Sequence, residues 1–387
     1  MKNQRSLCLR TRKSAILSAM NRKAVLCAVA LATGLSFGGP ISGWADDAAA
    51  AIAAGGLLPR RETRIVMAKE VLRISDKKVV VDYDFRNETD EEVTTEVAFP
   101  IPPYKNDFPE GSASAQSFKS FRLWVDGERI HYEAEAKAFL KGRNVTGILE
   151  QNHIDIPTFG HFDDTKDQVF VPDFSRLPKT AQNRLLKEGL FEDQGSLIYS
   201  LWTVHLQYHW TQVFPAHSTV HIRHEYAPAV GFTQVTSTAV DDSLARPAAN
   251  RSARGDSDGM KLLAGFCADR QFLNALGRKL KESELQAKTS DERLMAGTSY
   301  PHWVDFILTS ANTWQRPIED FTLILERPRS EQGGRFLVSF CSPGNVERLD
   351  VDHFQVHLDN FVPTAELHIG FFDLPKSKPV KPEAAKR

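Results

Sequence analysis

Five histidines within twenty residues give the sequence its clearest suggestion of metal chemistry: His205, His209, His217, His221 and His224. Histidine is a common ligand of zinc and other transition metals. If the chain turns near Ala216, His209 and His221 become diagonal neighbours on one face of a hairpin, within about 7–8 Å. A third ligand, such as His217 or a carboxylate, would complete a zinc site. A register shift of one residue would separate the two histidines, so solvated strand histidines are the alternative interpretation.

Nucleophilic catalysis has no comparable support. A hydrolase needs an activated nucleophile with a base within hydrogen-bond distance, and no Gly-x-Ser-x-Gly motif occurs after residue 45. The histidine-rich segment also lacks His-x-Glu and Cys-x-x-Cys spacings. We therefore assign no catalytic residue, no metal ligand and no cofactor. A metal-dependent hydrolase built on the His209/His221 face remains an alternative hypothesis.

Aromatic residues on the same predicted strand offer a second kind of site. Trp202, Tyr208 and Trp210 share one face at the strand period of two. Exposed rings of this kind would suit a carbohydrate-binding module, which is a further alternative. Core packing explains the same spacing and is favoured, because a β-sandwich buries one face of each strand.

Alternating apolar and polar residues predict that most elements are strands. The strongest hairpin pattern spans Leu201–Pro228, and another spans residues 79–99. Helical spacing appears only at 180–189 and 269–281. The expected fold is mainly β, with antiparallel β-sandwich-like units and a few inserted helices.

Composition divides the chain into five parts. Residues 1–45 are predicted to be a signal peptide, 46–236 an N-terminal β-rich unit, and 261–373 a C-terminal β-rich unit with one helix. Residues 237–260 are polar and lack periodicity, which predicts a linker or mobile loop. The Lys- and Pro-rich tail, 374–387, is predicted to be disordered.

The first 45 residues have the three regions of a secretory signal. Seven basic residues and no acidic one precede Asp46, the apolar run Ala24–Phe37 follows, and Gly43-Trp44-Ala45 provides a cleavage site. The run is shorter than the roughly 20 residues of a transmembrane span, although an uncleaved anchor is the alternative. Translation starts at either Met1 or Met20. We expect a periplasmic or otherwise extracytoplasmic protein with no stable membrane span after cleavage.

Removal of the signal makes the protein acidic. Seven of the 48 Lys and Arg residues leave and all 49 Asp and Glu residues stay, so the mature net charge is near −8. Such a charge disfavours nucleic acid and anionic membrane surfaces as partners.

The mature chain has two cysteines, Cys267 and Cys341. In an oxidising compartment this pair predicts one disulfide. Each follows a phenylalanine, Phe266 or Phe340, which suggests partial burial. Two separate buried thiols are the alternative, because sequence alone does not show how closely the Cα atoms approach.

Several segments together resemble the exported bacterial proteins grouped as domain of unknown function 4424 (DUF4424): Ala53–Leu57, Val81–Asn87, Val97–Pro102, His209–Ala216, His224–Gly231 and Leu308–Trp314. The resemblance covers nearly the whole mature chain. It implies an extracytoplasmic protein and carries no known activity or catalytic residue. A looser likeness, to the β-sandwich domain of inter-alpha-trypsin inhibitor heavy chains, is at the level of fold only.

The function we expect is that of an exported soluble envelope protein, acting as a non-enzymatic binding or scaffolding module. Its partner would be another envelope protein or a small ligand. Acidic charge, sandwich architecture and the missing catalytic signature all favour this hypothesis.

The cysteine hypothesis has a direct test. We expect the oxidised mature protein to show no free thiol when it is titrated under denaturing, non-reducing conditions. Two titratable thiols would refute the bridge between Cys267 and Cys341.

Overall fold

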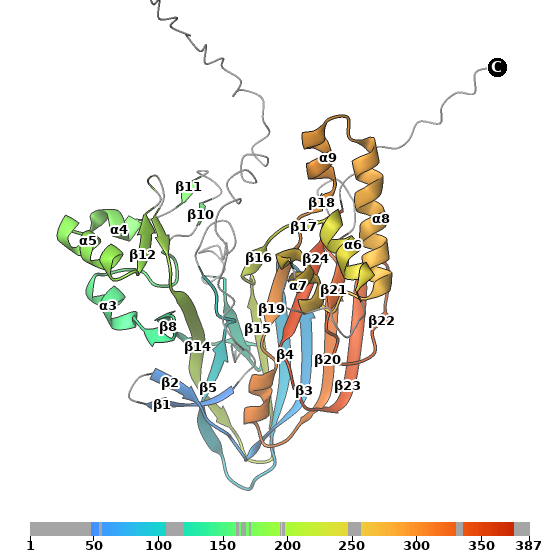
Figure 1. Cartoon of the computed structure of the whole chain (residues 1–387). Coiled ribbons are helices and arrows are strands. Elements are labelled where there is room, and N and C mark those ends of the chain that lie inside the picture. The colour runs from blue at the N-terminus through green and yellow to red at the C-terminus, as the bar shows by residue number, and fades with distance from the viewer. Residues whose placement is uncertain are drawn as a thin grey trace, which may run out of the picture. The chain divides into compact units, whose positions relative to one another are not determined.

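The computed structural model describes residues 48–53, 56–105, 120–159, 162–163, 168–169, 172–193, 195, 198–246, 257–329 and 336–374. The predicted signal peptide, residues 247–256 of the predicted linker and residues 375–387 of the predicted tail lie outside this description. Strands dominate the described chain and most of them pair in antiparallel sheets, which confirms the mainly β expectation (Figure 1).

An eight-stranded sheet is the largest element of the fold. In spatial order it contains β22 (Glu347–Arg348), β23 (His353–Phe361), β20 (Ile318–Glu326), β3 (Ile65–Ile74), β4 (Val79–Asn87), β15 (Thr219–Tyr226), β6 (Arg122–Val125) and β7 (Glu128–Arg129). Its neighbours are antiparallel except β20 and β3, which are parallel. Because that pair joins strands from both predicted β-rich units, a division into separate N- and C-terminal units does not describe this sheet.

Two further sheets complete the sandwich. A six-stranded sheet has the order β2 (Gly56–Pro59), β1 (Ala48–Ala53), β5 (Val93–Pro100), β14 (Thr203–Phe214), β8 (Glu133–Leu140) and β9 (Arg143–Asn144). A four-stranded sheet has the order β16 (Val230–Phe232), β19 (His302–Phe306), β24 (Leu367–Phe372) and β21 (Leu337–Phe340). Two-stranded ladders pair β10 (Phe162–Asp163) with β11 (Gln168–Val169), β12 (Phe191–Asp193) with β13 (Ile198–Ser200), and β17 (Val235–Thr236) with β18 (Thr298–Ser299).

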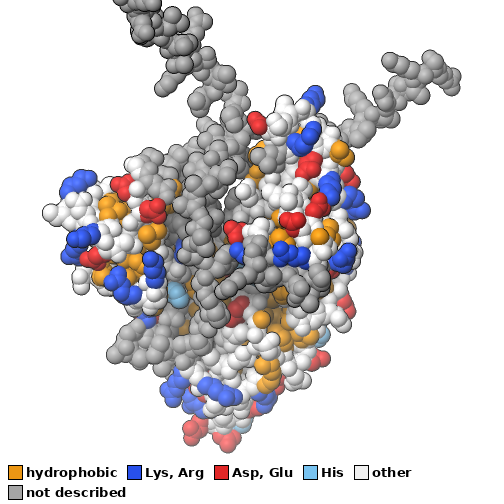
Figure 2. All heavy atoms as spheres, in the orientation of Figure 1, with side chains coloured by type: hydrophobic (Ala, Val, Ile, Leu, Met, Phe, Trp, Pro, Cys, Tyr) orange, Lys and Arg blue, Asp and Glu red, His pale blue; other side chains and the backbone are white. Residues whose placement is uncertain are grey.

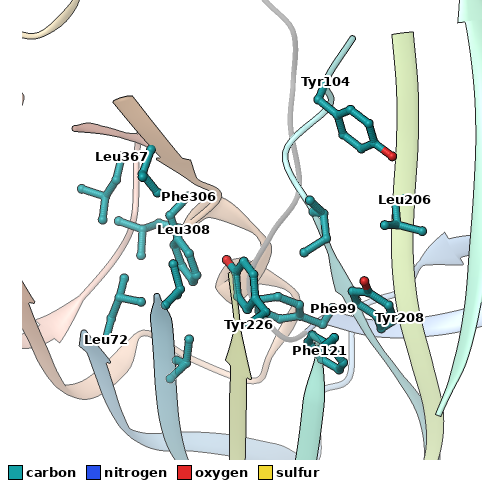
Figure 3. Close-up of a cluster of buried hydrophobic side chains, with 14 of the residues drawn as sticks. Leu72, Phe99, Tyr104, Phe121, Leu206, Tyr208, Tyr226, Phe306, Leu308 and Leu367 are labelled. Carbon is teal, nitrogen blue, oxygen red and sulfur yellow. The ribbon is translucent and has the colours of Figure 1, made fainter. Parts of the chain in front are cut away.

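The inner faces of the three large sheets share one apolar core. The residues with strand alternation turn one face inward, so Val81, Tyr83 and Phe85 of β4 are 0% exposed. Aromatic rings join the sheets: Phe121, at the start of β6, stacks on Tyr208 of β14 with ring centroids 3.9 Å apart (Figure 3). Burial of such large side chains supplies most of the stabilisation of a sandwich.

The predicted hairpins are wrong in their pairing. β14 is hydrogen-bonded to β5 and β8 in the six-stranded sheet, whereas β15 is bonded to β4 and β6 in the eight-stranded sheet. The chain therefore crosses from one sheet to the other between Phe214 and Thr219. The connection from β4 to β5 makes the same crossing. Alternation predicted the buried faces correctly, but two strands on facing sheets show the same alternation as two strands in a hairpin.

One buried side chain links the two crossings. The Asn87 amide is 0% exposed, and its Nδ2 donates to the carbonyl oxygens of Glu91 (2.8 Å) and Phe214 (2.9 Å). Its Oδ1 accepts hydrogen bonds from the backbone N–H and the hydroxyl of Thr89. The backbone N–H of Asn87 donates to the carbonyl oxygen of Ser218. Asn87 thus satisfies both polar groups of its amide while it holds the crossing segments together.

The helices are α3 (Thr146–Gln151), α4 (Pro172–Arg176), α5 (Lys179–Lys187), α6 (Ser237–Ala245), α7 (Asp258–Gly265), α8 (Arg270–Gln286), α9 (Ser290–Ala296) and the 3₁₀ helix η2 (Thr309–Thr313). Both predicted helices are confirmed, as α5 and α8. The Asp269 side chain caps α8 by accepting from the Phe272 N–H at 2.7 Å. Helices α6, α7 and α8 share a second apolar core with Phe372 of β24.

The linker prediction for residues 237–260 is wrong where the structure describes them. Ser237–Ala245 form α6, and α7 begins at Asp258. Thr236 caps α6 by accepting from the Ala239 N–H. The buried side of α6 consists of Ala239, Val240 and Ser243, and such small side chains give little apolar periodicity. Leu374, the last residue that the structure describes, packs against the helical core.

Replacement of Asn87 tests the importance of the crossings. We expect Asn87→Ala to lower the free energy of unfolding by about 2–4 kcal/mol, because buried carbonyl and N–H groups lose their partners. Denaturant unfolding of the disulfide-bonded protein measures this. Asn274→Ala, at an exposed position of α8, is the control and should change stability by less than about 0.5 kcal/mol. Equal effects of the two variants would contradict this role of Asn87.

Candidate functional site

The aromatic stripe is part of the core. Trp202, Tyr208 and Trp210 are 0%, 3% and 4% exposed. The Trp202 ring lies 5.6 Å from Phe159, and Trp210 Nε1 donates to the Gln212 side chain at 3.1 Å. Rings buried this deeply offer no face on which a sugar could stack, so the carbohydrate-binding hypothesis is wrong for these residues.

His209 lies on the outer face of the six-stranded sheet, between two carboxylates from neighbouring strands. Its Nδ1 is 2.7 Å from Oε1 of Glu96 on β5, and its Nε2 is 3.8 Å from Oε2 of Glu133 on β8. Thr211 donates to the other oxygen of Glu96 at 3.1 Å. Each imidazole nitrogen therefore faces an acidic group across a strand pair.

His221 lies on the outer face of the eight-stranded sheet, beside two carboxylates that both belong to β4. Its Nδ1 lies 2.9 Å from Asp84 Oδ1, and its Nε2 lies 3.6 Å from Asp82 Oδ1. Because β14 and β15 belong to facing sheets and both histidines point outward, His209 and His221 do not meet. The metal-site hypothesis, and the hydrolase built on it, are therefore wrong. Within the described residues, no group of three or more His, Cys, Asp or Glu side chains is arranged to hold a metal.

The other three histidines of the predicted cluster are also separate. The His205 ring lies 4.7 Å from Phe139; burial lowers the pKa of His205, and the charge of Lys137 lowers it further. His217 is exposed and pairs with Asp90 at 2.8 Å. His224 is 0% exposed and points into the core.

The burial of His224 and of Glu70 was not predicted. The His224 ring has its edge contacts with Tyr83, Phe99, Phe121 and Trp210, at centroid distances of 4.7–5.6 Å. Glu70 on β3 is 0% exposed and lies opposite Tyr83. Alternation could have revealed both positions, since Glu70 is in phase with Leu72 and His224 with Ile222.

The outer face of the eight-stranded sheet carries charged side chains that pair across strands. We call the following residues the charged face: Arg73, Lys78, Asp82, Asp84, His221, Arg223 and Glu225. Asp82 contacts Arg73 at 2.6 Å and Arg223 at 2.9 Å, and Glu225 contacts Lys78 at 2.8 Å. Arg73, Lys78 and His221 are close to half exposed, while Asp82 and Glu225 are 17% and 18% exposed.

Contacts between oppositely charged side chains continue toward the β23 side of the eight-stranded sheet. His357 on β23 lies 3.5 Å from Asp320 and 3.6 Å from Asp359. Lys69 on β3 also lies 3.7 Å from Asp320. Elsewhere on the molecule, acidic and basic side chains are likewise interspersed over the described surface in the view of Figure 2. The charged face is thus a two-dimensional pattern of opposite charges, not a single convergent site.

The predicted disulfide between Cys267 and Cys341 is present, with Cα atoms 5.0 Å apart. The predicted partial burial of the cysteines is wrong, because both are exposed. Phe266 is 1% exposed and turns inward, which leaves the following cysteine on the surface. Near this bridge, His368 of β24 is hydrogen-bonded to Asp305 of β19.

Comparison with known proteins identifies the family. A family model described as "Domain of unknown function (DUF4424)" matches residues 45–369. The chain belongs to the DUF4424 family. No curated protein matches the sequence. A solved structure from Legionella pneumophila, described as a "putative nutrient binding protein", is 13% identical, with a TM-score of 0.35 over 81% of this chain and 68% of that chain. At that similarity it carries no functional argument.

Segments on which the resemblance rested have structural roles. Trp314, at the end of one segment, packs on Phe85 with ring centroids 4.5 Å apart. In the same segment, the backbone N–H groups of Leu308 and Thr309 donate to Glu366 Oε2 at 2.8 and 3.1 Å.

No described helix is long and apolar enough to cross a membrane.

The pair His368–Asp305 makes stability depend on pH. Burial opposes the charge on His368, but the hydrogen bond to Asp305 and its negative charge raise the pKa of His368 above 6.5. A raised pKa contributes stability that is complete below the ordinary value and is lost as pH rises through the raised one.

We therefore expect the stability difference between wild type and Asp305→Asn to be larger near about pH 5.5 than near about pH 8.5. Urea unfolding at both pH values measures it. Asp90→Asn, beside the exposed His217, is the control and should show little change with pH. A difference for Asp305→Asn that stays constant or grows with pH would contradict this assignment.

Proposed function

We propose that this DUF4424 protein is an extracytoplasmic, non-enzymatic module that binds or scaffolds another protein of the cell envelope. The observation that carries the proposal is the charged face of the eight-stranded sheet. Its titratable groups engage one another across strands, as in the contacts of Asp82 with Arg73 and Arg223. This network of paired charges supports a role in recognition.

Energetics supports a role in recognition. Exposed ion pairs contribute only about 0–1 kcal/mol each to folding, so stability alone gives little reason to cover a sheet face with them. Patterned opposite charges do select partners and fix their orientation. An open sheet face also presents side chains over a wide area, whereas small-molecule sites are concave. These properties favour a protein partner over a small ligand.

The extracytoplasmic location rests on two observations. The first 45 residues have the organisation of an export signal. The Cys267–Cys341 disulfide is of a kind that persists in oxidising compartments and is rare in the cytosol. Both support a periplasmic or otherwise exported protein.

The proposal can be tested by crosslinking the tagged protein in its native envelope, followed by affinity capture and mass spectrometry. We expect one reproducible protein partner from wild type. The double variant Arg73→Gln/Arg223→Gln should recover at least about tenfold less of it, because complementary interface charges are lost. The control is Lys281→Gln on α8, whose partner Asp241 is similarly exposed, and it should capture the partner normally.

Each other outcome argues against part of the proposal. Full recovery by the double variant would place binding on another surface. Reproducible absence of a protein partner would contradict scaffolding and favour a small ligand. Turnover of a substrate that disappears on a point mutation would show that the protein is an enzyme. Melting curves of both variants establish that any loss does not come from unfolding.

A further inference from the structure

We propose that the Cys267–Cys341 disulfide is a thiol–disulfide exchange site: an incoming thiolate attacks Cys267 Sγ, and Cys341 leaves as a thiolate beside His368. This inference goes beyond the proposed binding function and does not depend on it. Three features of the structure carry it: exposure of the bridge, a histidine hydrogen-bonded to an aspartate near one sulfur, and the end of a helix next to the other.

The bridge is accessible, and one of its cysteines ends a helix. Cys267 and Cys341 are both exposed, so a thiolate in solution can reach them. Cys267 has φ of +51°, in the left-handed region. This conformation costs a non-glycine residue on the order of 1–2 kcal/mol, and it persists because the surrounding contacts hold it. The left-handed φ belongs to the end of α7, where the Cys267 N–H donates to the Ala264 carbonyl oxygen and the Ala268 N–H to that of Leu263. Exposed disulfides are of the labile kind.

Strand register brings His368 next to Cys341. Phe340, the last residue of β21, pairs with Ile369 of β24 in an antiparallel ladder. Cys341 follows the end of β21, and an extension of the register by one residue sets it opposite His368. Directly opposed residues of antiparallel strands share a face of the sheet. An independent contact agrees: the His368 ring lies 5.4 Å from Phe266, the residue before Cys267.

The charge on this histidine favours a thiolate on Cys341. Its hydrogen bond to Asp305 helps to keep the imidazole protonated. A neighbouring imidazolium lowers the pKa of a thiol and so improves it as a leaving group. Among the described residues, Asp305 is the charged group that contacts His368 from the adjoining strand.

Helix α7 disfavours a thiolate on Cys267. The helix ends at Gly265, and the backbone N–H of Cys267 donates to the carbonyl oxygen of Ala264. The C-terminal end of a helix carries partial negative charge, which raises the cost of a second negative charge there. The Gly265 carbonyl oxygen also lies 3.4 Å from Cys341 Sγ, so the imidazolium must outweigh it. Attack at Cys267 with departure of Cys341 is the direction that these charges favour.

The reaction balances with a dithiol as co-reactant. One thiolate of the dithiol forms a bond to Cys267 Sγ, the bond between the two protein sulfurs breaks, and Cys341 takes the electron pair and then a proton. The second thiolate of the dithiol displaces Cys267 from the mixed disulfide. Two electrons have then passed to the protein, and the dithiol is oxidised to a disulfide. The physiological co-reactant would be an exposed dithiol of an envelope oxidoreductase.

Reduction would loosen one contact between α7 and the four-stranded sheet. The hydrogen bond from the Ser339 hydroxyl to the Phe266 carbonyl, 2.9 Å and buried, would remain. The helical core around Phe266 would also stay packed. The exchange is therefore compatible with a folded product.

The test uses the oxidised mature protein under native conditions with dithiothreitol as the dithiol. Alkylation at intervals and mass spectrometry give the rate of reduction at about pH 7. We expect His368→Gln, which keeps a hydrogen-bonding side chain but has no charge, to react at least about threefold more slowly than wild type, because Cys341 becomes a poorer leaving group. His357→Gln is the control on the exposed face of another strand, and it should react like wild type.

A second measurement tests the direction of attack. A monothiol, 2-mercaptoethanol, traps the mixed disulfide, and peptide mapping locates it. Attachment to Cys267 supports the proposal, whereas attachment mainly to Cys341 overturns it. Equal rates for wild type and His368→Gln, or reduction only at denaturant concentrations that unfold the protein, would also overturn it. Each of these results leaves the envelope-binding proposal unaffected, since that proposal depends on the charged face.

Discussion

The sandwich depends on two chain crossings that lie side by side and are joined by one buried amide. β4 and β15 belong to one sheet, and β5 and β14 belong to the sheet facing it. The segments that carry the chain between the sheets converge on Asn87, which bonds to both. Because Asn87 bonds to both crossing segments, the two segments are held at a fixed distance from each other. This in turn sets how the inner face of the eight-stranded sheet lies against that of the six-stranded sheet. Ring contacts such as that between Phe121 and Tyr208 join the two inner faces in this alignment.

Sequence patterns predicted which residues face inward far better than which strands are neighbours. The alternation in β4 and β14 gave the buried faces, and the helical spacing in 269–281 gave α8, because local geometry alone determines both patterns. Pairing between strands depends on contacts across the whole chain, so the hairpins predicted at 79–99 and 201–228 were wrong. The disulfide could be predicted from cysteine number and compartment, whereas its exposure could not, since only the fold shows that Phe266 turns inward. Helix α6 was missed because its buried side chains are small.

For the candidate sites too, the sequence showed which residue types are present but not which of them lie together in the fold. The clustering of histidines in sequence suggested a shared site, but the strand period and the crossing distribute them over two outer sheet faces, the core and the connection between β14 and β15. His209, His221 and His357 instead each lie beside two carboxylates, at least one of which belongs to an adjacent strand. That arrangement requires cross-strand register, which no spacing within one strand encodes. The charged face and the exchange site were both invisible until the register was known.

The parallel pairing of β3 with β20 also constrains how the molecule is made. During synthesis β3 appears early, and β20 follows only after most of the chain has been added. Until then, the edge of β3 that β20 will cover has no partner from this sheet, and exposed strand edges pair readily with other chains. Contacts between residues this far apart also slow folding. The order of synthesis thus leaves a period in which the growing chain is open to aggregation, and assistance from a holding factor would matter most during that period.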